Sequence, residues 1–199
     1  MSHVAHWKRR SAALSRWLHL YLSMFSFLIV LFFAATGLTL NHADWFTRAV
    51  KPTMYKGALD SALLKNADSD ASKLAITGYL RRTHGIKSAL HDYRVDDSEC
   101  ELSFKGPGYS ADVFIDRATG RYQLAETRLG AVAVLNDLHK GRDSGKAWSL
   151  VIDVSAVLMT LVSATGLVLI FFLQKHRMAG FMAIGIGALL CVLVYWFLI

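Results

Sequence analysis

Three long stretches of the chain are almost purely apolar, and a polar segment separates the first from the second. The apolar stretches are residues 18–40, 148–173 and 178–199, and Asp153 is the one acidic residue within them. A helix needs about 20 apolar residues to cross the hydrocarbon core of a bilayer. The pattern therefore predicts three transmembrane helices with the polar segment, residues 41–147, as a domain between the first two.

The first apolar stretch resembles a secretory signal only superficially. Four basic residues precede it, but its core has about 23 residues, whereas a signal core has roughly 7–15. No clear small-residue cleavage site follows. We therefore predict a retained transmembrane helix preceded by a basic tail, residues 1–17.

The polar segment has the pattern of a small α+β domain. Residues 70–84 are amphipathic, with Leu74, Ile76 and Leu80 as the expected apolar side and Gly85 as the expected cap. Partial alternation then predicts three or four strands, at 89–95, 101–105, 111–116 and 122–126. The expected fold class is a membrane α-helical protein, with three transmembrane helices and one small α+β domain in which a helix packs on an antiparallel sheet.

Composition and charge exclude a soluble single-core protein and set an expected orientation. The 199 residues are 54% hydrophobic and only 19% charged, with a net charge of +7. Residues 41–147 hold 16 Lys/Arg and 14 Asp/Glu, so the excess lies in the tail and in the short turn 174–177. Short basic segments remain in the cytoplasm. We therefore expect the tail and the turn in the cytoplasm and residues 41–147 outside. We expect no nucleic-acid partner.

Several sequence pieces together resemble a known family. The hairpin Val113–Arg121 resembles the PepSY domain. The flanking pieces resemble the PepSY-associated transmembrane helix family; they are Leu18–Leu22, Ala35–His42, Leu138–Arg142 and Ala164–Leu167. Larger members have more spans, so this chain is a compact form. The resemblance implies a bacterial inner-membrane protein with haem, and a link to the reduction of ferric siderophores or iron. Cys100 and Cys191 form no haem-attachment motif, so any haem would be bound without covalent bonds.

Four histidines stand near the ends of the first two predicted spans. With the expected orientation, His42 and His139 share the outer face, and His19 and His176 share the inner face. Imidazole is a good axial ligand for haem iron. We therefore predict one or two b-type haems, one per pair. His19 and His42 are ~34 Å apart along a straight helix, which leaves a single outer haem as an alternative.

Other residues near these histidines have expected supporting roles. Gly37 and Gly166 could give a flat porphyrin clearance, and Arg142 could pair with a haem propionate. The alternative for the two glycines is that such small residues only allow helices to pack closely. For His176 the alternative is a solvated turn. Asp153 could be a helix cap or the partner of Arg142 or Lys146.

The sequence leaves the function open among three classes. The first is a haem protein that transfers electrons, as an oxidoreductase component. Since no dinucleotide or flavin motif is present, a quinol or a redox partner protein would supply its electrons. The second is a membrane-anchored module that binds a partner or inhibits a peptidase. The third is an accessory subunit of a respiratory complex, which the short length favours. The glycines of the third span suit close helix contact, either within the chain or with another chain or oligomer.

Overall fold

The computed structural model describes residues 3–46, 50–173 and 175–198, and it forms two compact units. The first unit contains Met1–Phe32 and Asp153–Ile199, and the second contains Phe33–Ile152. The long helices α1 (His3–Asn41) and α5 (Gly145–Phe172) contribute to both units, whereas α6 (Arg177–Leu198) belongs to the first.

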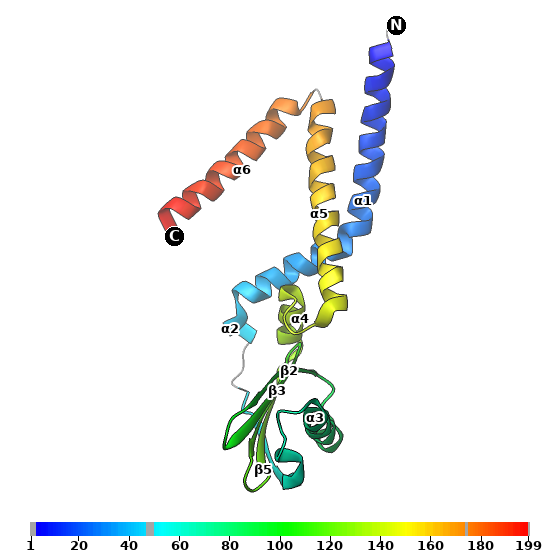
Figure 1. The fold of residues 1–199 in the computed structure, drawn as a ribbon. Coiled ribbons are helices and arrows are strands. Elements are labelled where there is room, and N and C mark those ends of the chain that lie inside the picture. The colour runs from blue at the N-terminus through cyan, green and yellow to red at the C-terminus, as the bar shows by residue number, and fades with distance from the viewer. Residues whose placement is uncertain (1–2, 47–49, 174, 199) are drawn as a thin grey trace. The chain divides into compact units, whose positions relative to one another are not determined.

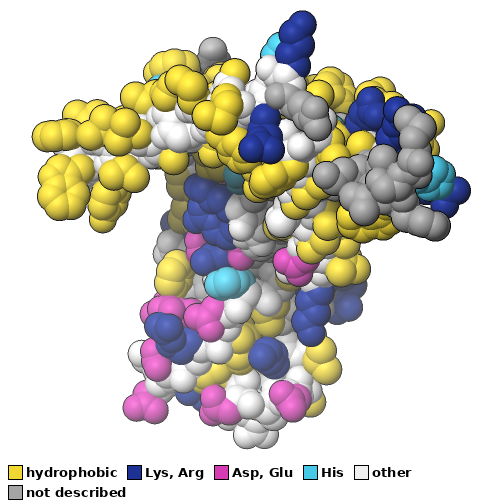
Figure 2. Space-filling view, turned by 90° about the horizontal axis from the view of Figure 1, so that it is seen from above, with side chains coloured by type: hydrophobic (Ala, Val, Ile, Leu, Met, Phe, Trp, Pro, Cys, Tyr) yellow, Lys and Arg dark blue, Asp and Glu magenta, His cyan; other side chains and the backbone are white. Residues whose placement is uncertain are grey.

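The first unit consists of membrane-spanning helices. Stretches of α1, α5 and α6 are long and apolar enough to cross a bilayer, namely Arg9–Asn41, Gly145–Phe172 and Arg177–Leu198. Few of their side chains are buried, and hydrophobic side chains cover α6, the arm at the left of Figure 2. Near their connection, α5 and α6 touch through Phe171 and Phe181, whose ring centroids lie 5.4 Å apart. The prediction of three long apolar helices is confirmed.

The second unit contains a five-stranded antiparallel sheet (Figure 1). Its order is β1-β5-β4-β3-β2, and each strand pairs with its neighbours in antiparallel register. The strands are β1 (Thr53–Ala58), β2 (Ala89–Val95), β3 (Glu99–Gly106), β4 (Tyr109–Asp116) and β5 (Arg121–Arg128). The four strands predicted by alternation are therefore present, and the α+β fold class is confirmed. Strands β1–β5 together with the helices that cover them form the sheet domain.

One face of the sheet is packed under helix α3 (Asp70–His84) and the short helix η1 (Ser61–Leu64). Alternate residues of the central strands point into this core, among them Leu102, Phe104 and Val113, which are at most 2% exposed. Ile76 and Leu80, four residues apart on α3, cover them. The expectation that Leu74 joins them is wrong. It is 74% exposed, because a position two residues from Ile76 lies about 200° around the helix.

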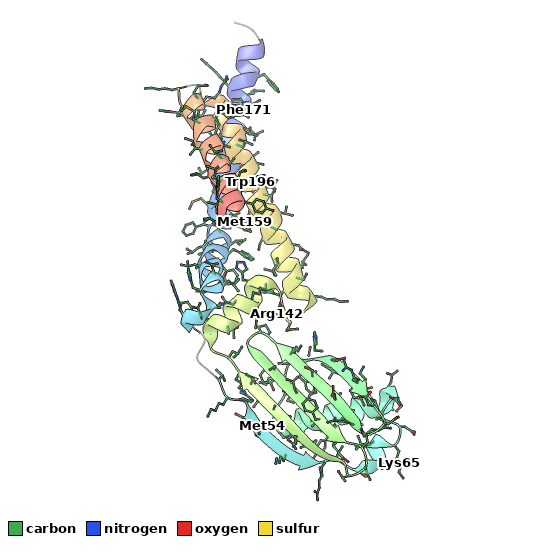
Figure 3. The ribbon with its side chains drawn as sticks, turned by 90° about the vertical axis from the view of Figure 1, so that its left-hand side faces the viewer. Met54, Lys65, Arg142, Met159, Phe171 and Trp196 are labelled. Carbon is green, nitrogen blue, oxygen red and sulfur yellow. The ribbon has the colours of Figure 1, made fainter. Side chains whose placement is uncertain are left out.

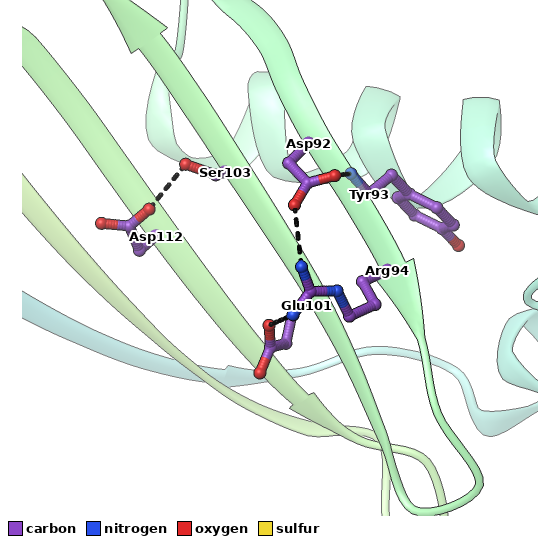
Figure 4. A network of polar contacts seen from close by, with 6 residues as sticks. All are labelled: Asp92, Tyr93, Arg94, Glu101, Ser103 and Asp112. Atoms are coloured by element: carbon purple, nitrogen blue, oxygen red, sulfur yellow. Dashed lines mark hydrogen bonds and ion pairs between the residues drawn. The ribbon is translucent and has the colours of Figure 1, made fainter.

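The opposite sheet face is polar. Ser103 donates a hydrogen bond to Asp112 across β3 and β4 at 2.7 Å (Figure 4). Arg94 lies 3.7 Å from Asp92 and 3.8 Å from Glu101 on the same face. Such exposed ion pairs contribute about 0–1 kcal/mol each, so they mark a solvated face rather than a second core.

The turn between β4 and β5 has the chemistry that its sequence predicts. Gly120 has a φ of +70° and its N–H donates to the carbonyl of Asp116 at 2.8 Å. The backbone N–H and the hydroxyl of Thr119 both donate to the Asp116 carboxylate, at 2.7 and 2.8 Å. These bonds hold the pKa of Asp116 below its usual range. The turn is thus a structural element.

Four elements were not predicted from the sequence. Besides η1 these are β1, the single-turn helix α2 (Ala43–Phe46) and the helix α4 (Ala131–Lys140). Strand β1 is an edge strand, and its burial pattern does not alternate. Met54 on this strand is visible in Figure 3. Helix α4 carries His139, one of the candidate site residues.

Candidate functional site

In the first unit, His19 on α1 contacts a threonine and a glycine of α5. The Nδ1 atom of His19 lies 3.0 Å from Oγ1 of Thr165. Gly166 lies against the same ring, since a Cβ atom added there would be 3.1 Å from Cε1 of His19. The His19 side chain is half-buried. The structure therefore brings together His19 and Gly166, as the expected porphyrin clearance requires, and adds Thr165.

The hydroxyl of Thr165 already has acceptors for its proton. It lies 2.9 Å from the carbonyl oxygens of both Leu161 and Val162 in the preceding turn of α5. A threonine hydroxyl has one proton and two lone pairs. The oxygen therefore has lone pairs that can accept a proton from Nδ1 of His19.

In the second unit, His139 has the same kind of surroundings. Its Nδ1 lies 2.6 Å from Oγ1 of Thr36 on α1. A Cβ atom added at Gly37 would be 3.7 Å from Cε1 of His139, and the Phe33 ring meets the imidazole edge-on at 5.0 Å. Thr36 itself is only 4% exposed. His139 is thus held by a Thr-Gly pair, as His19 is.

Helix α4 places His139 in its last turn and is fixed at several points. Gly141 ends the helix with a φ of +69°, and the Trp148 indole donates to the carbonyl of Leu138 at 2.8 Å. Thr39 donates to the side-chain oxygen of the buried Asn136 at 2.7 Å. These bonds hold α4 against the last turns of α1 and fix the position of the imidazole.

The hairpin between β3 and β4 also holds α4. The backbone N–H of Gly108, in the tip of this hairpin, donates to the Asp137 carboxylate at 2.9 Å. The carbonyl of Gly108 accepts from Leu129 at 2.8 Å, just before α4 begins. A side-chain atom at Gly108 would collide with Val134 on the same helix.

His42 and His176 have different surroundings. The His42 ring stacks on Trp45 with a centroid separation of 3.9 Å and an interplanar angle of 12°. His176 is exposed, just before α6, and its carbonyl accepts from Gly180 at 2.9 Å. Among the described residues no contact joins His42 to His139 or His19 to His176. The structure thus does not bring together the two histidine pairs expected from the sequence.

The charged residues near the site pair differently from the expectation. Arg142, in the loop after α4 (Figure 3), lies 3.7 Å from the carboxylate of Asp137 and is 59% exposed. Asp153 is exposed and is the ninth residue of α5, whose first turn begins at Gly145. The idea that Asp153 caps this helix is therefore wrong.

A second polar cluster lies in the sheet domain. His84 shares a hydrogen bond with the Tyr122 hydroxyl at 2.9 Å, and burial lowers its pKa, partly offset by the charge of Glu126. Glu126 is 7% exposed. Burial alone would raise its pKa, but bonds from Arg128 at 2.7 and 3.0 Å outweigh burial and lower it. These contacts make His84 a partly buried residue of the sheet domain's fold. The more exposed His91 lies 3.4 Å from Asp143.

The two threonines are the site residues that sequence reasoning missed. A signal was present, because Leu-His occurs at Leu18-His19 and Leu138-His139, and Ala-Thr-Gly-Leu occurs at Ala35–Leu38 and Ala164–Leu167. The structure shows what this duplication does. The Thr-Gly pair of each copy contacts the histidine of the other copy.

Comparison with known proteins agrees with the architecture. Residues 13–199 match the profile of the family described as Putative PepSY_TM-like. No curated protein and no solved structure is significantly similar to the chain. The family match covers nearly the whole chain, so this protein belongs to the PepSY_TM-like family of membrane proteins.

Proposed function

We propose that this protein is a b-type haem protein that transfers electrons in the membrane, with His139 and His19 as the principal iron ligands. The observation that carries the proposal is the shared environment of these two imidazoles. Each is held at Nδ1 by a threonine, lies against a glycine, and receives no hydrogen bond at Nε2 from any residue in the described ranges. Histidines that bind metals are usually held in this way at the nitrogen that does not bind the metal.

The residues present suit a haem. The donor set is imidazole, and no cysteine lies beside either histidine, which fits non-covalent binding. Gly166 and Gly37 keep side-chain atoms away from the two rings. In the first unit, Ser26 is fully buried and its hydroxyl has no partner among the described residues, so the helix interface already accommodates an unpaired polar group.

Each residue has a definite task in this proposal. His139 and His19 would each hold an iron through Nε2. His42 and His176 do not contact these two imidazoles, and they stay predicted additional ligands. Arg142 is exposed and only weakly engaged by Asp137, so it is the candidate to neutralise a propionate. When bound, the haem would supply reversible one-electron chemistry.

The direction of electron flow follows from an orientation that we also propose. The basic tail and the basic turn at 174–177 would lie in the cytoplasm, and the sheet domain outside. A quinol or a redox partner protein would supply electrons, and ferric iron, free or bound to a siderophore, is the proposed acceptor. The sheet domain would then face the acceptor.

The experiment is a reduced-minus-oxidised visible spectrum of the purified full chain, expressed with a haem supply. We expect the spectrum of a low-spin b-type haem. His139→Ala should give a five-coordinate spectrum or lose haem, and His176→Ala should have the smaller effect because its side chain is exposed. A wild-type protein without haem would contradict the proposal and favour a partner-binding module.

A further inference from the structure

We infer that Thr36 and Thr165 are positioning residues that determine which ring nitrogen of His139 and His19 carries the proton. Each threonine oxygen accepts the Nδ1 proton of its histidine, so Nε2 keeps a free lone pair. The assignment of the tautomer stands on hydrogen bonding alone. Its consequence for iron binding rests on the proposed haem function.

The hydrogen bonds of Thr165 constrain the proton most directly. The carbonyl oxygens of Leu161 and Val162, both 2.9 Å from its hydroxyl, can only accept a proton. With the single hydroxyl proton directed at these carbonyls, Oγ1 meets Nδ1 of His19 at 3.0 Å through a lone pair. We therefore assign the proton of this hydrogen bond to Nδ1 of His19.

Thr36 makes the corresponding contact in the other unit, and we assign its proton by analogy with Thr165. Its hydroxyl lies 3.4 Å from the carbonyl oxygen of Phe33 in its own helix and 2.6 Å from Nδ1 of His139. The side chain is 4% exposed, so water has little access to compete for either group. Each contact joins a Thr-Gly pair in one copy of the duplicated motif to the histidine of the other copy.

A threonine also suits the surroundings better than the carboxylates that often orient metal-binding histidines. Both threonines lie on helices that are long and apolar enough to cross a membrane, where an ionised carboxylate is costly. A hydroxyl that is already bonded to its own helix accepts the Nδ1 proton without adding a charge. The absence of an added charge therefore favours a threonine over an aspartate as the acceptor for each histidine.

The inference predicts different results for two similar substitutions. Thr165→Val and Thr36→Val keep the shape of the side chain but remove the acceptor. The Nδ1 proton then has no partner in apolar surroundings, and the ring shifts toward the tautomer with the proton on Nε2. Thr165→Ser and Thr36→Ser keep the oxygen and serve as matched controls.

The test begins with haem-free full-length protein in detergent, labelled with ¹⁵N in histidine. NMR reports which ring nitrogen carries the proton, and His19→Gln and His139→Gln assign the two signals. We expect Nδ1–H in the wild type and in the serine variants, and a shift to Nε2–H in the valine variants. Nε2–H in the wild type would overturn the inference before any variant is needed.

Haem titration of the same proteins separates this inference from the proposed function. We expect about a 10–100-fold weaker affinity in the valine variants and near-wild-type affinity in the serine variants. If the tautomers behave as expected but no protein binds haem, the positioning role stands and the haem function fails. If serine and valine variants show the same tautomer loss, the positioning role is wrong.

Discussion

Gly166 lies directly against the imidazole of His19, because a Cβ atom added at this glycine would be 3.1 Å from Cε1. At that distance a larger side chain must displace the ring. The ring is also bonded to Thr165, the neighbouring residue, so both the glycine and the threonine determine where His19 lies.

This contact predicts a selective effect of Gly166→Val. The branched side chain should push His19 away from Thr165 and lower haem content at least several-fold, measured by pyridine haemochrome per mole of protein. Gly185→Val is the matched control, since nothing lies within 4 Å of a Cβ atom at that position of α6. Equal haem loss in both variants would indicate general damage to the membrane helices and contradict a specific role of Gly166.

The orientation can be tested by labelling with a membrane-impermeant maleimide. Cys100 cannot report on it, because its side chain is fully buried and burial raises the pKa of its thiol. The test therefore uses a Cys191→Ala background with either Asp97→Cys or His6→Cys, both at exposed positions. We expect intact cells to label the cysteine at 97 but not the one at 6. The reverse pattern would contradict the proposed orientation.

Gly120→Val should destabilise the sheet domain. The position needs a φ of +70°, and a Cβ atom would overlap the carbonyl oxygen of Leu59. Backbone strain of this kind costs about 1–3 kcal/mol, and the collision adds to it. Pulse proteolysis of the full chain measures the loss. Gly130→Val, at a residue with φ −72° and open space around it, should change stability by much less.

Stability of the sheet domain should fall when the pH drops below about 6.5. Burial lowers the pKa of His84 in the folded protein, so below the ordinary value near 6.5 the unfolded chain binds more protons than the folded one. Protonation then favours unfolding, while the full contribution is present above that pH. His84→Gln should flatten the decline between pH 7 and pH 5 in proteolysis assays. An unchanged slope would show that His84 is not responsible.

The periodicity of the sequence predicted most elements of the fold but not all of them. Strands β3 and β4 alternate between buried and exposed residues, so their faces are visible in the sequence. Strand β1 lies at the edge and packs few side chains, so its residues carry no such alternation. Helix α4 is only 10 residues long and follows directly after a strand, so it is hidden in what reads as a loop.

The candidate site was predictable in its histidines and glycines but not in its threonines. Imidazole near a membrane boundary is a local signal, and so is a glycine within an apolar helix. The contact between His19 and Thr165 joins residues 146 positions apart, and only the packing of helices brings them together. The other two ligands expected from depth in the membrane, His42 and His176, stay predictions. The His42 ring stacks on Trp45, and His176 is exposed.

The hydrogen bonds between the β3–β4 hairpin and α4 limit how the protein can be engineered or recombined. Hairpin tips usually tolerate inserted epitopes and fused loops. Here Gly108 bonds to Asp137 and Leu129, so an insertion would loosen the helix that bears His139. A chimera that exchanges the sheet domain between relatives should therefore transfer α4 with it. The smallest exchangeable unit outside the long helices therefore extends through Lys140 rather than ending with the last strand.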